Sequence, residues 1–289
     1  MFSILIPSLN NLEYLRLCIH SIRKNSKYKH EIIIHVSEDK DNTTGYLNNE
    51  NIKYTQTRYN AGICEGVNKA STLSTSDYIL YAHDDFYFCP GWDTAILKEV
   101  NNLKHNLFYF SGIMIEKETV KGAFGTDLTN FNEKKLLNEN KNLIFDDFQG
   151  STWAPHLIHK SIWNKVGGFS EEYFPGTGSD PDLNKKLWDL GVRVFKGIGC
   201  SKVYHFGSIV TRKYNKDKYN VTESGNKGAK IFLLKWGITI KFFRKFYLKS
   251  DTKYIDILKE PKRSAGFIYN LFKCKIFYIY IKYIYRFKK

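Results

Sequence analysis

Two adjacent carboxylates, Asp84 and Asp85, follow the mainly apolar residues 77–82 after a single intervening residue, His83. A run of this kind predicts a buried strand, so both side chains are expected at its carboxyl end. Two carboxylates this close repel each other unless a cation or a basic group lies beside them. A hard divalent cation takes such oxygen ligands and can also bind the oxygens of a diphosphate. On this local sequence alone, a metal site and a pair of solvated loop aspartates are equally good interpretations.

The elements that would position this pair alternate between strands and helices. Apolar runs predict strands, and helical spacing of apolar residues predicts helices between them. The predicted strands are residues 2–6, 31–36, 52–57 and 77–82, and the predicted helices are residues 12–22 and 62–73. Such alternation is typical of an α/β fold with a doubly wound, mostly parallel sheet, which binds ligands at the carboxyl ends of its strands. The residues expected at that edge are Ser8, Glu38, Asn60 and Asp85.

The second half of the chain is less regular. Apolar segments predict strands, and helices are predicted after Pro90, up to Val166 and in the segment that follows Pro181. The segments expected to be ordered are 107–115, 150–166, 182–190, 192–195 and 202–206, whereas 117–147 is left unassigned. No GxxxxGK[ST] motif occurs, and no GxGxxG follows the first strand, so the sequence does not support a phosphate loop or a Rossmann dinucleotide fold.

Residues 58–93 resemble the family 2 glycosyltransferases of GT-A fold over their whole length. In that family an Asn-x-Gly turn precedes a helix with a second Asn, and then come a Gly/Ser-Asp-Tyr strand, a short acidic motif and a Pro-Gly-Trp turn. The matching residues are Asn60-Ala61-Gly62, Asn68, Ser76-Asp77-Tyr78, His83-Asp84-Asp85 and Pro90-Gly91-Trp92. Several matches in the right order are more specific than one, so the resemblance favours the metal site.

The resemblance covers roughly residues 2–215. Residues 6–10 are similar to the first strand and turn that hold the nucleotide, and residues 36–39 occupy the place of an acidic turn that contacts its base. Downstream, residues 165–171 are similar to the family's KVGGFDE segment, and residues 178–183 stand in place of Glu-Asp-x-Asp-Leu. Residues 203–205 match a strand whose His often completes the metal site. The donor-binding residues implied by the resemblance are Pro7, Ser8, Asn10, Glu38, Asn60, Gly62, Asn68 and Asp84.

The resemblance therefore implies an inverting glycosyltransferase of hexosyltransferase type that uses a nucleotide-diphosphate sugar and a divalent cation, Mn²⁺ or Mg²⁺. A metal held by Asp85 and His205 would neutralise charge on the leaving phosphate. Asp180 would act as general base on the acceptor hydroxyl, and one displacement with one base inverts the anomeric centre. The expected acceptor is a glycan, a glycolipid or a similar molecule of polysaccharide biosynthesis. Taken singly, His205 could be a structural histidine, and Asp180 and Asp182 could cap a helix.

Departures from the family pattern leave two alternatives open. His83 stands where the acidic motif usually begins with Asp, Ser179 replaces the Glu before the base, and Glu38 stands where Asp is usual. These changes motivate a catalytically inactive GT-A module that only binds glycans. A nucleotidyltransferase, whose sheet also binds nucleotide and metal, is the second alternative.

The charge of the chain is concentrated at its C-terminal end. The net charge is +15, and residues 226–289 contain 17 Lys or Arg and 3 Asp or Glu, which leaves about +1 on residues 1–225. We therefore expect a catalytic domain over 1–225 and a basic, aromatic-rich, helical extension over 226–289. Residues 226–249 have the spacing of an amphipathic helix. The extension is expected either to contact an anionic membrane or to pack on the body with its lysines in water, whereas a nucleic-acid partner is not expected.

Cysteine usage and the N-terminus favour a cytoplasmic location, peripheral to the inner face of a membrane if the extension binds lipid. The five cysteines form no CxxC pair, so neither a zinc site nor a disulfide framework is expected. The first ten residues meet a Pro too early for the apolar part of a signal peptide.

Overall fold

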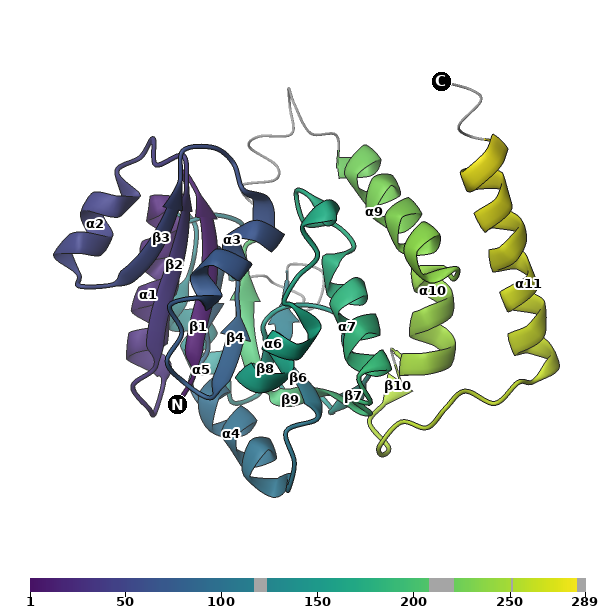
Figure 1. The fold of residues 1–289 in the computed structure, drawn as a ribbon. Coiled ribbons are helices and arrows are strands. Elements are labelled where there is room, and N and C mark those ends of the chain that lie inside the picture. Colours follow the sequence, from purple (N-terminus) through teal and green to yellow (C-terminus); the bar gives the residue numbers. More distant parts are fainter. Residues whose placement is uncertain (117–123, 208–220, 251, 285–289) are drawn as a thin grey trace.

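A computed structural model describes residues 1–116, 124–207, 221–250 and 252–284. The described residues contain one mixed sheet with the strand order β10-β7-β9-β6-β8-β4-β1-β2-β3, and β5 pairs with β9 off this path. Helices flank the sheet, and the C-terminal helices form the side of the molecule farthest from β1–β3 (Figure 1). This architecture confirms the predicted α/β fold.

The first half of the sheet is parallel. Strands β1 (Ser3–Leu9), β2 (Glu31–Ser37), β3 (Lys53–Thr57) and β4 (Tyr78–Tyr81) pair in the order β3-β2-β1-β4. The helices that connect them are α1 (Leu12–Asn25), α2 (Thr43–Asn49) and α3 (Gly62–Ser71). Strands β1 and β2 consist almost wholly of buried residues because helices cover both faces of a sheet of this type. The sequence predicted β2, β3 and β4 to within one residue at each end, whereas β1 continues three residues beyond its predicted end.

The second half of the sheet is mixed. Strand β8 (His156–His159) runs antiparallel between β4 and β6 (Phe108–Ile115), and β6 pairs in parallel with β9 (Val194–His205). The short strands β5 (Phe86–Phe88) and β7 (Phe148–Gln149) run antiparallel to β9. Consequently β1–β4, β6, β9 and β10 point in one direction and only β5, β7 and β8 oppose them, so the described sheet is mostly parallel. The helices of this half are α4 (Trp92–Asn102), α5 (Glu133–Glu139), α6 (Lys160–Val166) and α7 (Ser179–Asp189), with a 3₁₀ turn, η1 (Glu171–Tyr173).

Two predicted boundaries in this half are wrong. Helix α7 begins at Ser179 and not at Asp182, because Pro181 lies in the first turn, where the helix needs no backbone N–H donor. Residues 192–195 and 202–206 do not form two strands but belong largely to the single strand β9. Gly197 and Gly199, which lie between the two predicted strands, let the ring of Phe148 and the carbonyl of Phe145 lie directly on β9.

The segment after residue 225 packs on the body. It contains α9 (Val221–Trp236), α10 (Ile240–Phe242), the π-helix η2 (Phe243–Leu248), β10 (Thr252–Lys253), α11 (Ala265–Ile279) and the π-helix η3 (Tyr280–Ile284). Strand β10 joins the sheet through β7, and Phe232, Phe243 and Leu258 belong to the main hydrophobic core. The continuous amphipathic helix predicted over 226–249 is wrong, since Gly237 has a φ of 68° and Thr239 caps a new helix. The domain boundary near residue 225 stays a prediction. Among the described residues, no helix is both long and apolar enough to cross a membrane.

Candidate active site

The carboxyl ends of β1, β2 and β4 bring most of the predicted donor-binding residues to one edge. Ser8 at the end of β1 donates a hydrogen bond to Asp84 with an Oγ–Oδ2 distance of 2.7 Å. Asn10 donates from Nδ2 to Oε2 of Glu38 at 3.0 Å, which joins the turns that follow β1 and β2. The backbone of this edge is strained, because Asn10, Glu38 and Asp39 have φ values of 47°, 67° and 66°. Strain of this kind costs about 1–3 kcal/mol per residue and is concentrated at functional sites.

Asp84 is a buried carboxylate whose charge is poorly compensated. Burial and the neighbouring charge of Asp85 raise the pKa of Asp84 to about 7, and the hydrogen bond from Ser8 only partly opposes this shift. A buried carboxylate at a strand end with a raised pKa indicates a place for a bound cation or a polar ligand.

A cluster of three possible metal ligands lies beside Asp84. The ligand atoms of His83, Asp85 and His205 all lie within 4.8 Å of one another. Asp85 and His205 come together because β5 pairs with β9, in a register that places Phe86 opposite His205. The distance from Nε2 of His205 to Oδ1 of Asp85 is 3.5 Å, and Nδ1 of His83 lies 4.0 Å from the same oxygen.

The surroundings of this cluster suit a cation. Nδ1 of His205 contacts Oε1 of Glu116 at 2.5 Å, an arrangement in which a carboxylate orients a metal-binding histidine. Burial lowers the pKa of His83 to about 4, which keeps its imidazole in the neutral form that binds metals. Burial also lowers the pKa of His205, but hydrogen bonds to Asp85 and Glu116 outweigh it and raise that pKa to about 9. The donor set of two imidazoles and a carboxylate fits Mn²⁺ better than Mg²⁺, which prefers oxygen ligands.

His83 and Glu116 were missed as members of this site by sequence reasoning. His83 was noted only as a departure from the acidic motif, although a histidine next to two aspartates is itself a signal for a metal. Glu116 follows directly on β6 and carries no motif, so only the parallel pairing of β6 with β9 brings it to His205. Ser179, which stands in place of the Glu that precedes the base in the family pattern, is buried and donates to the carbonyl of Gly176 at 2.6 Å.

Asp180 lies apart from the metal cluster, in the first turn of α7. Its Oδ1 atom is buried without a hydrogen-bond partner, although the side chain as a whole is 25% exposed. Burial raises the pKa of Asp180 to about 7. Nδ1 of His156 lies 3.8 Å from Oδ1 of Asp180, and burial lowers the pKa of that histidine to about 3. The carboxylate therefore faces a neutral imidazole, and it keeps the basicity that a general base needs near neutral pH.

Aromatic rings separate Asp180 from the cation cluster. The ring of His156 lies 5.2 Å from that of Tyr81, and the ring of Tyr81 lies 5.3 Å from that of His83. Tyr81 is fully buried, and both Asp180 and Asp85 act on its pKa, which burial raises well above the usual value. The rings of His156 and Tyr81 thus link the carboxylate of high basicity, Asp180, to the cation-binding cluster.

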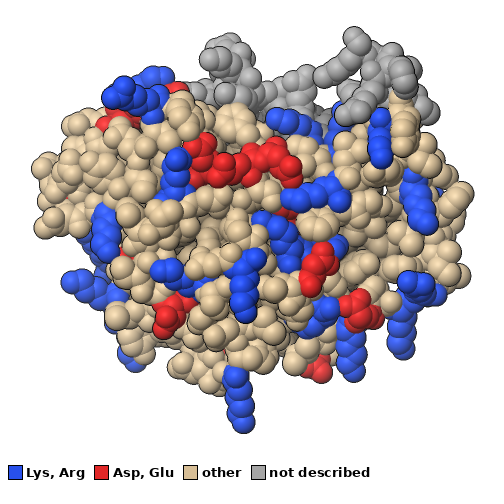
Figure 2. Space-filling view, in the orientation of Figure 1, with Lys and Arg blue, Asp and Glu red and all other residues tan. Residues whose placement is uncertain are grey.

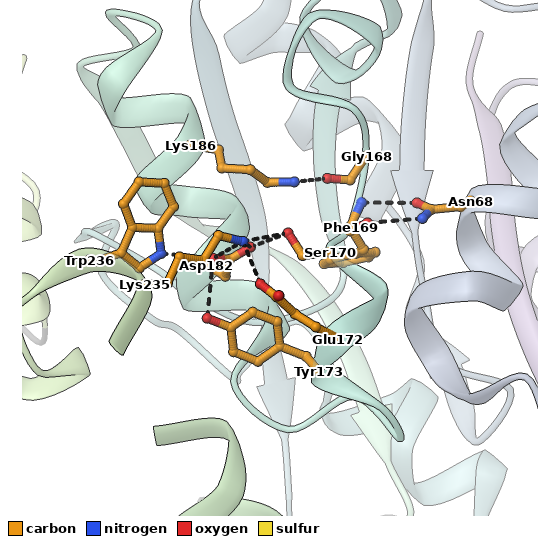
Figure 3. Close-up of polar contacts among 10 residues, drawn as sticks. All are labelled: Asn68, Gly168, Phe169, Ser170, Glu172, Tyr173, Asp182, Lys186, Lys235 and Trp236. Carbon is orange, nitrogen blue, oxygen red and sulfur yellow. Dashed lines mark hydrogen bonds and ion pairs between the residues drawn. The ribbon is translucent and has the colours of Figure 1, made fainter. Parts of the chain in front are cut away.

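The predicted residues in α3 and in the turn before it hold neighbouring loops in place. Oδ1 of Asn60 accepts a hydrogen bond from the backbone N–H of Gly62 at 2.9 Å, and Gly62 has a φ of 67°. A side chain at Gly62 would collide with Phe174 and the carbonyl of Pro175. Asn68 does not lie with the other donor-binding candidates but exchanges two hydrogen bonds of 2.9 Å with the backbone of Phe169 (Figure 3). Its donor-binding role stays a prediction, as do the roles of the other candidates.

Asp182 joins α7 to the C-terminal helix α9. This fully buried carboxylate accepts hydrogen bonds from Ser170 Oγ at 2.6 Å and from Trp236 Nε1 at 2.8 Å. Lys235 Nζ lies 3.1 Å from it and also contacts Glu172, at 2.8 Å (Figure 3). Sequence reasoning missed Lys235 and Trp236 because they are more than 50 residues from Asp182 and belong to the segment expected to be an extension.

Comparisons with known proteins agree with this geometry. Residues 3–163 match the sequence profile described as glycosyl transferase family 2. No curated protein sequence gives a significant match. The matched residues include Asp84 and Asp85, whereas Asp180 and His205 lie beyond them, so the correspondence expected as far as residue 215 stays a prediction there.

Solved structures with a similar fold include fragment 1–349 of TarS from S. aureus. It is 13% identical, with a TM-score of 0.54 over 79% of this chain and 69% of the fragment. The same fragment in complex with UDP-GlcNAc is 12% identical, with a TM-score of 0.53 over 81% of this chain and 73% of the fragment. GalNAc-T7 with UDP, GalNAc and Mn²⁺ is 15% identical, with a TM-score of 0.54 over 71% of this chain and 43% of that protein. At these identities the likeness shows the fold alone.

Proposed function

The chain belongs to glycosyl transferase family 2, and from this premise we propose that it moves a hexose from a nucleotide-diphosphate donor to a hydroxyl of a glycan or glycolipid, with inversion. The observation that carries the proposal is that a cation-binding cluster and two carboxylates of raised pKa, Asp84 and Asp180, lie around Tyr81. The cluster and Asp84 at the strand ends suit the diphosphate, and Asp180 suits the acceptor hydroxyl.

The donor would lie along the carboxyl ends of β1, β2 and β4. Asn10 and Glu38 hold the two turns together, and the positive φ values there fix the backbone that would receive the nucleotide. Asp84, held by Ser8, would face the sugar or its phosphates. His83, Asp85 and His205 would hold a divalent cation, for which Mn²⁺ is the first choice, and when bound it would neutralise charge on the departing diphosphate.

Asp180 would accept the proton of the acceptor hydroxyl. The burial that raises its pKa to about 7 leaves a useful fraction of the carboxylate ionised at neutral pH while keeping it basic. The acceptor oxygen then forms a bond to the anomeric carbon as the bond from that carbon to the diphosphate oxygen breaks. One displacement of this kind inverts the anomeric configuration.

Asn68, Asp182 and Lys235 would act on acceptor binding through the loop 168–178. Their hydrogen bonds hold the first part of that loop, with Phe169 against α3 and with Ser170 and Glu172 against α9 (Figure 3). The proposed acceptor is part of a polysaccharide, glycolipid or similar molecule. The proposed place of the reaction is the inner face of an anionic membrane, approached through residues 226–289.

A panel of nucleotide sugars, each tested by thermal shift with and without Mn²⁺, examines the donor part of the proposal. A donor that binds only the folded state raises the melting temperature, by mass action. We expect a rise with one nucleotide class that requires the metal, and UDP-GlcNAc and UDP-GalNAc are sensible first members because the similar folds bind UDP compounds. Turnover then separates the alternatives. Release of a nucleoside diphosphate from the nucleotide sugar supports a glycosyltransferase, release of pyrophosphate from a nucleoside triphosphate and a sugar phosphate supports a nucleotidyltransferase, and binding without turnover supports an inactive module.

A further inference from the structure

Helix α11 is attached to the body by one narrow stripe. Phe267, Cys274 and Ile281 are its buried residues, seven positions apart along α11 and η3. The ring of Phe267 packs on Phe242 with centroids 5.0 Å apart, and Cys274 Sγ lies 3.7 Å from Thr239 Oγ1. Figure 1 shows α11 as the outermost element on this side of the molecule. Its opposite face is therefore open in the described structure.

That opposite face is strongly apolar. Phe272 is 61% exposed and Ile276 is 53% exposed, values that are unusual for side chains of this size. At 3.6 residues per turn most of the exposed apolar residues fall on the side of the helix away from Phe267 and Cys274, whereas Phe277, also exposed, lies nearer to these two. This outward face consists of Ile268, Tyr269, Phe272, Ile276, Ile279, Tyr280 and Tyr283. A continuous exposed apolar patch of this kind marks an interaction surface.

Lysines lie on both flanks of the outward face. By helical geometry Lys273 falls on one flank and Lys275 and Lys282 fall on the other. The ammonium of Lys273 lies over the ring of Tyr269 at 4.3 Å, and that of Lys282 lies over the ring of Tyr283 at 5.3 Å. No acidic residue occurs after Glu260, and the edge formed by α11 shows tan and blue but no red in Figure 2.

We propose that the outward face of α11 is a docking surface for an anionic lipid bilayer. An apolar face flanked by lysines inserts its side chains at the boundary between headgroups and acyl chains and brings the ammonium groups to the headgroup phosphates. A second copy of the chain fits this surface poorly, because two basic faces without acidic residues would repel each other. This proposal refines the membrane location proposed above for residues 226–289. It assigns lipid contact to α11 alone, because α9, α10 and η2 pack on the core of the body. It does not depend on the transferase chemistry.

Vesicle co-sedimentation of the full-length protein tests the surface. The probes are vesicles of phosphatidylcholine mixed with phosphatidylglycerol, compared with vesicles of phosphatidylcholine alone, at low and at high salt. We expect binding to the anionic vesicles that weakens with salt, because charges beyond a Debye length of about 10 Å at 0.1 M are screened. Phe272→Ser with Ile276→Ser should weaken binding at least tenfold, and Lys273→Gln with Lys275→Gln about 30-fold, at roughly fivefold per lysine.

Matched controls exclude general effects of charge and hydrophobicity. Ile144→Ser with Ile255→Ser removes two exposed apolar side chains elsewhere, and Lys98→Gln with Lys141→Gln removes two exposed lysines of the body. Both controls should bind like the wild type, and circular dichroism should show that all variants are folded. Wild-type binding by either α11 variant would overturn the proposal. Failure of the wild-type protein to bind anionic vesicles would also overturn the proposal. This includes the outcome in which the α11 face mediates dimers or binds single-stranded RNA and the protein does not bind the vesicles. Donor turnover in detergent-free solution is measured on the same samples, so failure of the lipid surface and failure of the proposed function remain distinguishable.

Discussion

Replacing Lys235 by Met tests the contact between α9 and the base-bearing helix α7. The carboxylate of Asp182 is fully buried, and in Lys235→Met it loses a charged partner 3.1 Å away but keeps neutral donors from Ser170, Tyr173 and Trp236. A hydrogen bond to a charged group contributes about 1.5–3 kcal/mol. The side chain of Lys235 is 29% exposed, so solvent screens part of this interaction, and we expect a loss near the lower end, about 1.5 kcal/mol.

The pKa of Lys235 fixes the pH at which this stabilisation can be measured. Burial opposes its charge, but hydrogen bonds to Glu172 and Asp182 outweigh burial and raise the pKa. A lysine whose pKa is raised on folding stabilises the protein fully below its ordinary value of about 10.4, and the stabilisation is lost only as pH rises further. A measurement at pH 7 therefore captures all of it.

Urea unfolding followed by circular dichroism gives the difference. Lys235→Met should lower the midpoint with an unchanged slope, and the exposed Lys241→Met, on the neighbouring helix α10, should stay within about 0.5 kcal/mol of the wild type. Trp236→Phe should lower the free energy of unfolding by a similar amount. The double variant should lose less than the sum of the two single losses, because both side chains contact Asp182. If Lys235→Met unfolds at the wild-type midpoint, the contact does not hold α9 on the body.

Three further predictions follow from Asp180 and Asn68. Asp180→Asn should lower transfer by about 10²–10⁴-fold while donor binding, measured by thermal shift, is retained; a variant that still transfers at the wild-type rate would contradict the assignment of the base. The raised pKa of Asp180 means that the folded protein holds a proton that the unfolded chain releases near pH 4, so this group's contribution to stability is present below about pH 4 and is lost as pH rises through about 7. Asp180→Asn should therefore match the wild type near pH 4 and exceed it by about 1–3 kcal/mol at pH 8 in unfolding free energy, and parallel pH profiles would argue against the burial described. Asn68→Ala should lower the unfolding free energy by about 2 kcal/mol, because it leaves the backbone N–H and carbonyl of Phe169 without their partners; unchanged stability would show that solvent replaces these bonds.

The sequence predicted the parallel half of the sheet because its strands are short apolar runs with clear ends. Residues 2–6 and 31–36 are apolar runs too short for a buried helix and therefore predict strands. Residues 77–82 form a similar run, so Asp84 and Asp85 are predicted at a strand end. The family pattern added Asp180 and His205, which no local periodicity would single out. The structure brings His205 to Asp85, and it places Asp180 beside His156, whose ring contacts Tyr81.

Long-range pairing accounts for what the sequence did not predict. Glu116 becomes part of the cation cluster only through the register of β6 on β9, and Lys235 reaches Asp182 only because α9 folds back on α7. The continuity of β9 was not predicted, since Gly197 and Gly199 leave room for Phe148 and Phe145, which come from a segment without a recognisable pattern. The basic composition after residue 225 predicts a separate extension. In the described structure this segment includes most of α9, which packs on the main core, and β10, which joins the sheet.

Metal-dependent release of a nucleoside diphosphate is the most direct test of the proposed chemistry. The protein is freed of metal with a chelator, and release from the donor found by thermal shift is followed as Mn²⁺ is added back. We predict no release without metal, recovery with Mn²⁺, a loss of at least about 100-fold in Asp85→Ala, and wild-type behaviour in Asp256→Ala, which removes an exposed carboxylate far along the chain. Release that continues at the same rate in the chelator, or that survives in Asp85→Ala, would contradict the assignment of His83, Asp85 and His205 to a catalytic cation.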